Sequence, residues 1–104
     1  MSKLVVLYDK PTDTAAFEKH FRAVHMPLVE KMPGLRGYSY GPATGLDESP
    51  GAYFWSFIGT FDSRQAILDA FGTAEGQAVA ADIPNYSPDA PTILFVDSTE
   101  SAAS

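Results

Sequence analysis

HMPLVEKMPGL, residues 25–35, contains the end of a helix and the turn that leads into a strand. Pro27 has no N–H for the carbonyl four residues earlier, so the helix is expected to kink or restart just beyond His25. Pro33 and Gly34 should then end the helix, because Gly34 can adopt the left-handed conformation that a Cβ opposes. The chain must therefore turn here and continue as a strand.

Apolar residues upstream of this stretch recur with helical spacing. Asp13 can cap the helix, which is expected to run from about residue 13 to residue 31. His25 lies on one margin of its apolar face and His20 on the other, so neither histidine is expected to face only solvent. The apolar positions are separated by four, three, four and four residues: Phe17, Phe21, Val24, Leu28 and Met32.

The remaining segments predict a ferredoxin-like α+β fold. Strands are expected at residues 3–8, 35–40, 53–61 and 92–96, with both faces of the first and third buried. A capping box at Asp62 and Gln65 predicts a short helix, a second helical piece should cover residues 73–82, and prolines predict an irregular segment at residues 83–88. The resulting order, βαββαβ, is that of an antiparallel sheet with helices on one face.

Length and composition limit the possible functions. The 104 residues support one domain, residues 1–97, followed by a flexible tail at residues 98–104. The net charge of -6 and the lack of any lysine or arginine cluster argue against nucleic acid and membrane surfaces as partners. The apolar run at residues 4–7 is too short for a signal peptide or a membrane span, so a cytoplasmic location is expected.

The aromatic content predicts self-association. Tyr53, Trp55 and Phe57 alternate with Phe54 and other residues along the third strand, so both faces of the sheet carry apolar side chains. A single layer of helices covers only one face. We therefore expect a homodimer in which two sheets pack face to face as a barrel, with a cavity between the subunits or between sheet and helices.

His25 is the candidate for acid–base chemistry, because imidazole changes charge near neutral pH. The alternative is that His25 only hydrogen-bonds a neighbouring group and caps the kinked helix. His20 is expected to pack beside Phe17 and Val24. The two histidines point about 140° apart on a helix and the chain has no cysteine, so no metal site is expected.

Aromatic residues with polar tips are the candidate ligand contacts: Tyr38, Tyr40, Trp55 and Tyr86. As a set they favour an apolar ligand over a phosphorylated one, and no phosphate-binding loop is present. The alternative for each of them is packing in the core or at a dimer interface.

Four phrases together resemble the EthD family, named for ethyl tert-butyl ether degradation. They are FEKHF at residues 17–21, HMPL at residues 25–28, MPGL at residues 32–35 and EGQAVAADIPNY at residues 75–86. The resemblance extends from Leu4 to about Val96. It implies a dimeric α+β barrel, a fold shared with small monooxygenases, muconolactone isomerases and polyketide cyclases. It also implies a connection with a cytochrome P450 oxidising system.

Three functions are compatible with these observations. The first is a cofactor-free catalyst or accessory subunit that acts on an apolar oxygenated molecule in an oxidative degradation or biosynthetic pathway. Such an enzyme would be oxidoreductase-associated, or would resemble a cyclase or isomerase with His25 as general acid or base. The second is a non-catalytic module that binds a ligand and serves a partner oxidase. The third is a haem-binding barrel in which one histidine is the axial ligand.

Overall fold

The computed structural model describes residues 1–47 and 51–99. Its helices are α1 (Thr14–His20), a π-helical turn (Phe21–His25), α2 (Met26–Val29), α3 (Arg64–Phe71) and α4 (Ala74–Tyr86). Its strands are β1 (Ser2–Tyr8), β2 (Gly37–Pro42), β3 (Trp55–Phe61) and β4 (Thr92–Asp97). The predicted βαββαβ order is confirmed, with the second helical region divided into α3 and α4.

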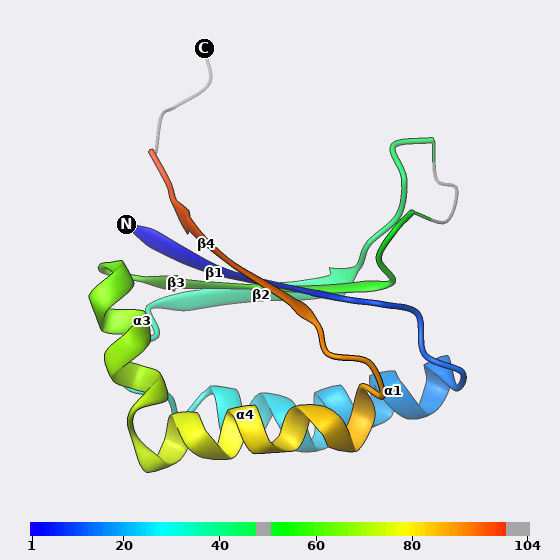
Figure 1. The fold of residues 1–104 in the computed structure, drawn as a ribbon, viewed down its shortest axis with the longest axis horizontal. Coiled ribbons are helices and arrows are strands. Elements are labelled where there is room, and N and C mark those ends of the chain that lie inside the picture. Colours follow the sequence, from blue (N-terminus) through cyan, green and yellow to red (C-terminus); the bar gives the residue numbers. More distant parts are fainter. Residues whose placement is uncertain (48–50, 100–104) are drawn as a thin grey trace.

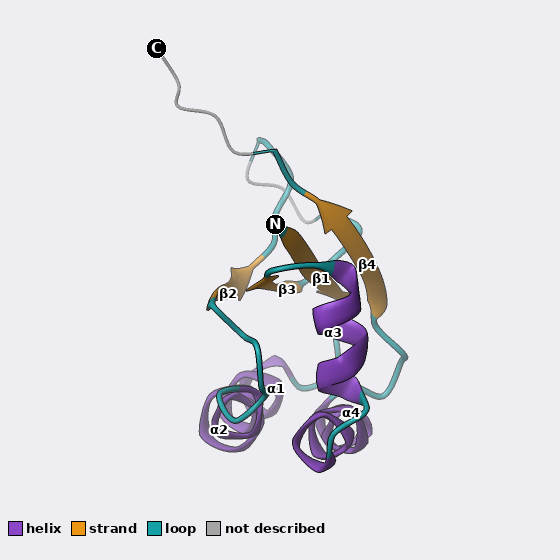
Figure 2. Cartoon of the chain, turned by 90° about the vertical axis from the view of Figure 1, so that its left-hand side faces the viewer, coloured by secondary structure: helices purple, strands orange, loops and turns teal. Residues whose placement is uncertain are grey.

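The strands form one antiparallel sheet in the order β2-β3-β1-β4. Figure 1 shows the α1–α2 segment and α4 beneath this sheet, with α3 joining β3 to the helical layer. Figure 2 views the α1–α2 segment and α4 nearly end-on, side by side on the same face of the sheet. The fold is therefore ferredoxin-like, and its core lies between one sheet and one layer of helices.

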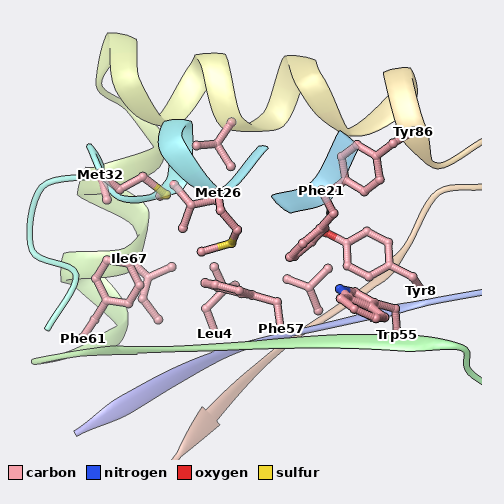
Figure 3. Close-up of a cluster of buried hydrophobic side chains, with 14 of the residues drawn as sticks. Leu4, Tyr8, Phe21, Met26, Met32, Trp55, Phe57, Phe61, Ile67 and Tyr86 are labelled. Atoms are coloured by element: carbon pink, nitrogen blue, oxygen red, sulfur yellow. Dashed lines mark hydrogen bonds between the residues drawn. The ribbon is translucent and has the colours of Figure 1, made fainter. Parts of the chain in front are cut away.

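Alternation along the strands decides which side chains enter this core. Leu4, Val6 and Tyr8 of β1 are buried, whereas the residues between them are only half-buried. Trp55 and Phe61 of β3 are also fully buried on the helix side (Figure 3). Successive strand residues point to opposite faces, so one face packs against the helices and the other remains outside.

The outer face of the sheet differs from the prediction. Both faces of the first and third strands were expected to be buried, but Ile58 of β3 is 37% exposed and Val5 of β1 is half-buried. All six residues of β4 are exposed. The prediction was wrong for the single chain, because no helix covers this face.

The helix after Asp13 restarts as α2 at Met26, just beyond His25, as Pro27 predicted, but the π-helical turn before that restart was not indicated by the sequence pattern. The Asp13 side chain accepts a hydrogen bond from the N–H of Ala16, as expected for the cap. The Met26 N–H then donates to the Phe21 carbonyl, five residues back, which makes residues 21–25 a π-helical turn. Gly34 ends the region with φ of 82°, as predicted.

The π-helical turn changes the buried face of this segment. It holds one residue more per turn than an α-helix, so positions beyond Phe21 are displaced around the axis. Val24, expected in the apolar stripe, is 44% exposed, whereas His25 and Met26 are each 3% exposed. The predicted marginal position of His25 was therefore wrong, since the turn moves the imidazole into the core.

Several other boundaries differ from the prediction. The cap of α3 is Ser63, which accepts from the Ala66 N–H, whereas Asp62 pairs with Arg36. The second strand begins two residues later than expected, at Gly37, and the third begins at Trp55.

Helix α4 continues through the segment that was predicted to be irregular and includes Pro84. Proline removes one hydrogen bond, but the helix ends only at Tyr86, where the Ser87 N–H donates to the Ile83 carbonyl. Packing of Asp82 and Tyr86 against the opposite helix accompanies this continuation.

The start of β1 and the end of β4 lie side by side, and the Ser98 N–H donates to the Met1 carbonyl. Residues 48–50, between the second and third predicted strands, and residues 100–104 of the predicted tail lie outside the described residues. Within residues 1–47 and 51–99, no helix is long and apolar enough to cross a membrane.

Candidate functional site

A buried carboxylate links the two histidines. Asp82 Oδ2 lies 2.9 Å from His25 Nδ1, and Asp82 Oδ1 lies 2.9 Å from His20 Nε2. The Asn85 amide donates a third hydrogen bond to Asp82 Oδ1, at 3.0 Å. Asp82 is only 6% exposed and His25 is also buried, whereas His20 is partly exposed and Asn85 lies at the surface.

Two helices bring these groups together. Thr73 caps α4 by accepting from the Gly76 N–H, and the helix then presents Val79, Asp82 and Tyr86 on one buried face. That face packs against the π-helical turn that carries His25. Spacings of three and four residues place side chains on the same side of a helix, so one helical face supplies both the carboxylate and an aromatic ring.

The environment favours an ionised Asp82 and a neutral His25. Burial disfavours the Asp82 anion, but hydrogen bonds from Asn85, His20 and His25 outweigh this effect and hold the pKa of Asp82 below its usual value. For His25, burial lowers the pKa below 6.5 despite the opposing hydrogen bond and charge of Asp82. With Nδ1–H donating to Asp82, Nε2 is the ring nitrogen left to accept a proton.

A pair of tyrosines lies beside the histidines. The Tyr8 and Tyr86 hydroxyl oxygens are 2.7 Å apart, and the Tyr86 ring centroid lies 4.8 Å from that of His25. Burial raises the pKa of Tyr8 to about 12 and also raises the pKa of Tyr86. Both phenols are therefore neutral at physiological pH, and one hydroxyl donates a hydrogen bond to the other.

His25 and Tyr8 line a small cavity between the helices and the sheet, which we call the inner cavity. Its volume is about 70 Å³. Ile93, which is 51% exposed, lies on its wall and marks the side nearest solvent, between α4 and β4. The other lining residues are apolar: Leu4, Val6, Val29, Met32, Phe57, Phe71, Val79, Ala80 and Ile83. His25 and Tyr8 thus form part of the wall of an almost entirely apolar space that admits a small molecule or one end of a larger one.

The EthD domain family matches residues 9–89 of this chain. The chain belongs to the EthD family. A relative from Rhodococcus erythropolis, an uncharacterized 11.0 kDa protein encoded in the thcB-thcC intergenic region, is 33% identical over 97 residues, covering 93% of this chain and 94% of the relative. The resemblance inferred from the sequence phrases is thereby confirmed.

Solved structures agree with this membership. An EthD family protein from Bacillus halodurans is 27% identical, with a TM-score of 0.88 over 95% of this chain and 99% of that chain. A dimeric ferredoxin-like protein of unknown function from Thermobifida fusca is 17% identical, with a TM-score of 0.67 over 91% of this chain and 87% of that chain. The second similarity shows the shared fold alone.

The four aromatic residues predicted to contact a ligand lie at different places relative to the histidines in this EthD protein. Tyr86 contacts both histidine rings, whereas Tyr40 and Trp55 contact Phe21, which in turn contacts His25. The Arg22 guanidinium lies over the Tyr40 and Trp55 rings, at 5.6 Å and 5.5 Å. Tyr38 is 43% exposed and donates its hydroxyl hydrogen bond to Glu30, away from the histidines.

Trp55 provides an unpaired donor in the core. Its side chain is fully buried, and its Nε1–H has no hydrogen-bond partner in the described part of the chain. Figure 3 shows this nitrogen on the side of the indole ring that faces the interior of the core.

Sequence reasoning missed Asp82, Tyr8 and the role of His20. His20 was expected only to pack, but its ring hydrogen-bonds Asp82 and stacks on Tyr86 with centroids 5.4 Å apart. A signal for Asp82 existed, since it is a single acid on the helical face that carries Val79 and Tyr86. Charged residues are rarely buried without a partner, so an acid on this buried face implied a hydrogen-bond or ion-pair partner on a facing element.

The larger hollow near the loop after β2 has no comparable chemistry. Its volume is about 380 Å³, and its polar side chains include Lys10, Thr14 and Tyr53, with no histidine. In the part of the chain that the structure describes, no group of three or more histidine, cysteine or acidic side chains is arranged to hold a metal ion. The histidine pair and the inner cavity are therefore the better candidate site.

Proposed function

We propose that this EthD protein is an acid–base catalyst in which His25 accepts a proton from a small, weakly acidic organic molecule in the inner cavity. The observation that carries the proposal is the 2.9 Å contact between His25 Nδ1 and the buried Asp82 carboxylate, beside that cavity. A carboxylate behind Nδ1 fixes the ring tautomer and stabilises the imidazolium that forms when Nε2 takes a proton.

The chemical class of ligand follows from the lining of the inner cavity. Apolar side chains surround His25 and Tyr8, so an uncharged molecule with one acidic group, such as an enol or a phenol, suits the space better than a charged metabolite. The neutral Tyr8 hydroxyl is the group available to stabilise an oxyanion beside the histidine. A volume of about 70 Å³ implies that only the reacting end of a larger ligand enters.

The protein as proposed acts in the cytoplasm as a homodimer, in an oxidative degradation or biosynthetic pathway. The half-exposed or exposed outer side chains Val5, Ile58 and Leu94 support dimerisation, because they are adjacent in the sheet register and form an apolar row. The Thermobifida fusca structure with the same fold is described as dimeric. The oxidative role rests on the family resemblance.

A second candidate function is ligand binding without catalysis, in support of a partner oxidase. The small, mainly apolar inner cavity favours this alternative, since it can hold an apolar group without any reaction.

One experiment distinguishes the two functions. Nitroethane, a small carbon acid, is incubated with the protein in D2O, and exchange of its acidic hydrogens is followed by NMR. Catalysis predicts faster exchange than in buffer, and His25→Gln should reduce the enhancement at least tenfold, or about 1.4 kcal/mol of barrier. Tyr53→Phe, which alters the separate larger hollow, is the control and should exchange like the parent.

The outcomes separate catalysis by His25 from binding alone. Equal exchange rates for the parent and His25→Gln, with both folded, would reject acid–base catalysis by His25. If nitroethane shifts the NMR signals of His25 without any accelerated exchange, the binding function is favoured. Circular dichroism on each variant verifies that the fold is retained.

A further inference from the structure

The two histidines that share Asp82 face different cavities. His25 lines the inner cavity, and its side chain is 4% exposed. His20 lines a separate hollow of about 240 Å³ between α1 and the end of α4, which we call the outer pocket, and its side chain is 26% exposed. Asn85 and Tyr86 also line the outer pocket. Asp82 thus connects a histidine that lines the inner cavity with a histidine that lines the outer pocket.

The hydrogen bonds determine which nitrogen of each ring is available. An ionised carboxylate only accepts hydrogen bonds, so Asp82 requires N–H donors at His25 Nδ1 and at His20 Nε2. The nitrogens that remain for proton exchange are Nε2 of His25 and Nδ1 of His20. Asn85 supplies the third donor and cannot change its charge.

One negative charge is available for two imidazoles. Tyr8 from β1 and Tyr86 from α4 are the other titratable side chains that pack beside this group, and burial raises the pKa of both, so they remain neutral. Asp82 can balance a single imidazolium, and a second positive charge would be uncompensated in a largely buried site. The His20 side chain is 26% exposed and that of His25 only 4%, so water solvates a positive charge on His20 better than one on His25.

We propose that His20, Asp82 and His25 form one charge-sharing unit, in which proton uptake at His25 in the inner cavity is coupled to proton release from His20 into the outer pocket. In each event one proton joins Nε2 of His25 and one proton leaves Nδ1 of His20 for water. The hydrogen bonds to Asp82 stay in place, and the net charge of the unit does not change. His20 is therefore a positioning residue whose charge adds to the effect of burial in disfavouring protonation of His25.

The coupling itself requires no ligand, whereas its use in catalysis rests on the proposed function. NMR of the full-length protein labelled at the histidine rings follows both imidazoles across the pH range from about 4 to 9. The signals of His25 should respond in two steps, one of which coincides with the titration of His20, as expected for interacting groups.

Two variants isolate the charge of His20. His20→Gln keeps an N–H donor for Asp82 but cannot be protonated, so His25 should titrate in one step with its pKa raised by about one unit. Asn85→Ala removes a neutral donor from the same carboxylate and should preserve the two-step response of His25. A structural role for His20 alone would affect thermal stability without changing the shape of the His25 titration.

The proposal is overturned if His25 titrates in one step in the parent protein and at the same pH in His20→Gln. Should His20→Gln fail to fold, the parent titration decides alone, because a single step there already shows that the rings are uncoupled. A two-step response combined with unaccelerated nitroethane exchange would retain the charge-sharing unit and reject only the catalytic function.

Discussion

At the scale of single residues, the balance between burial and hydrogen bonding sets the protonation state of His25 at the candidate site. His25 is almost completely buried, yet its Nδ1 has an anionic partner at 2.9 Å. Burial is the stronger influence, so the pKa of His25 lies below its ordinary value of 6.5. A neutral imidazole with a fixed tautomer is the form that a general base requires.

The lowered pKa of His25 predicts a dependence of stability on pH. In the unfolded chain this histidine is protonated below about pH 6.5, whereas in the folded protein it stays neutral to lower pH. The unfolded state therefore binds more protons as the pH falls below about 6.5, and stability decreases until the folded pKa is passed. We expect the melting temperature to fall between about pH 7 and pH 5, as measured by circular dichroism.

A matched variant identifies the group responsible. His25→Gln removes the titrating imidazole, so its melting temperature should change less over the same pH range than that of the parent. An identical decrease in both proteins would assign the effect to other groups. The low pKa of Asp82 adds a further loss only in more acidic solution, because its stabilisation disappears as the carboxylate is protonated.

At the scale of elements, the junction between α3 and α4 has little space. Gly76 lies in the first turn of α4, where an added Cβ would lie 2.1 Å from the Ala70 carbonyl oxygen and 2.6 Å from Phe71 Cα. Both of these atoms belong to the backbone of α3, so a side chain at residue 76 requires the two helices to separate. Their close approach sets the direction in which α4 presents Asp82.

Gly76→Ala should destabilise the protein, because the backbone must shift to accommodate the methyl group. We expect a loss of about 1–3 kcal/mol in the free energy of unfolding, measured by urea denaturation. Gly37→Ala is the control, since a Cβ there meets no atom within 4 Å. If both variants unfolded at the same urea concentration as the parent, the proposed steric limit at the junction would be wrong.

Sequence patterns predicted the elements better than their irregularities. Asp13 and the turn at Gly34 were evident because capping and left-handed backbone depend on a few neighbouring residues. The π-helical turn before Met26 and the continuation of α4 through Pro84 were not predicted. Both accompany contacts between helices that are distant in sequence, and tertiary packing can outweigh local preference.

At the scale of the whole molecule, the helices cover one face of the sheet and leave apolar side chains on the outer face exposed. Val5 pairs in register with Ile58 on one side and with Leu94 on the other. Ile58 is 37% exposed and Leu94 is 45% exposed. This continuous apolar row explains why we propose a homodimer through the sheets.

A charge on this row should dissociate the proposed dimer. Leu94→Lys would place an ammonium group in an apolar interface, so sedimentation equilibrium at micromolar concentration should show a species near 11.2 kDa in place of a dimer. Leu68→Lys is the control, because Leu68 is 53% exposed on α3 and lies outside this row. A parent protein that already sediments as a monomer would refute the dimer.

The sequence alone determined the order of the elements and the ferredoxin-like α+β fold, because spacing, caps and turns are local features that a single chain displays. The family followed from the resemblance of four phrases. It also identified His25 as the candidate base, from the chemistry of imidazole and its place beside the helical core face. Only the tertiary structure decided that Asp82 joins His25 to His20 and that Tyr8 lies beside them. These residues come from β1, α1, the π-helical turn and α4, and their meeting depends on how the layers pack.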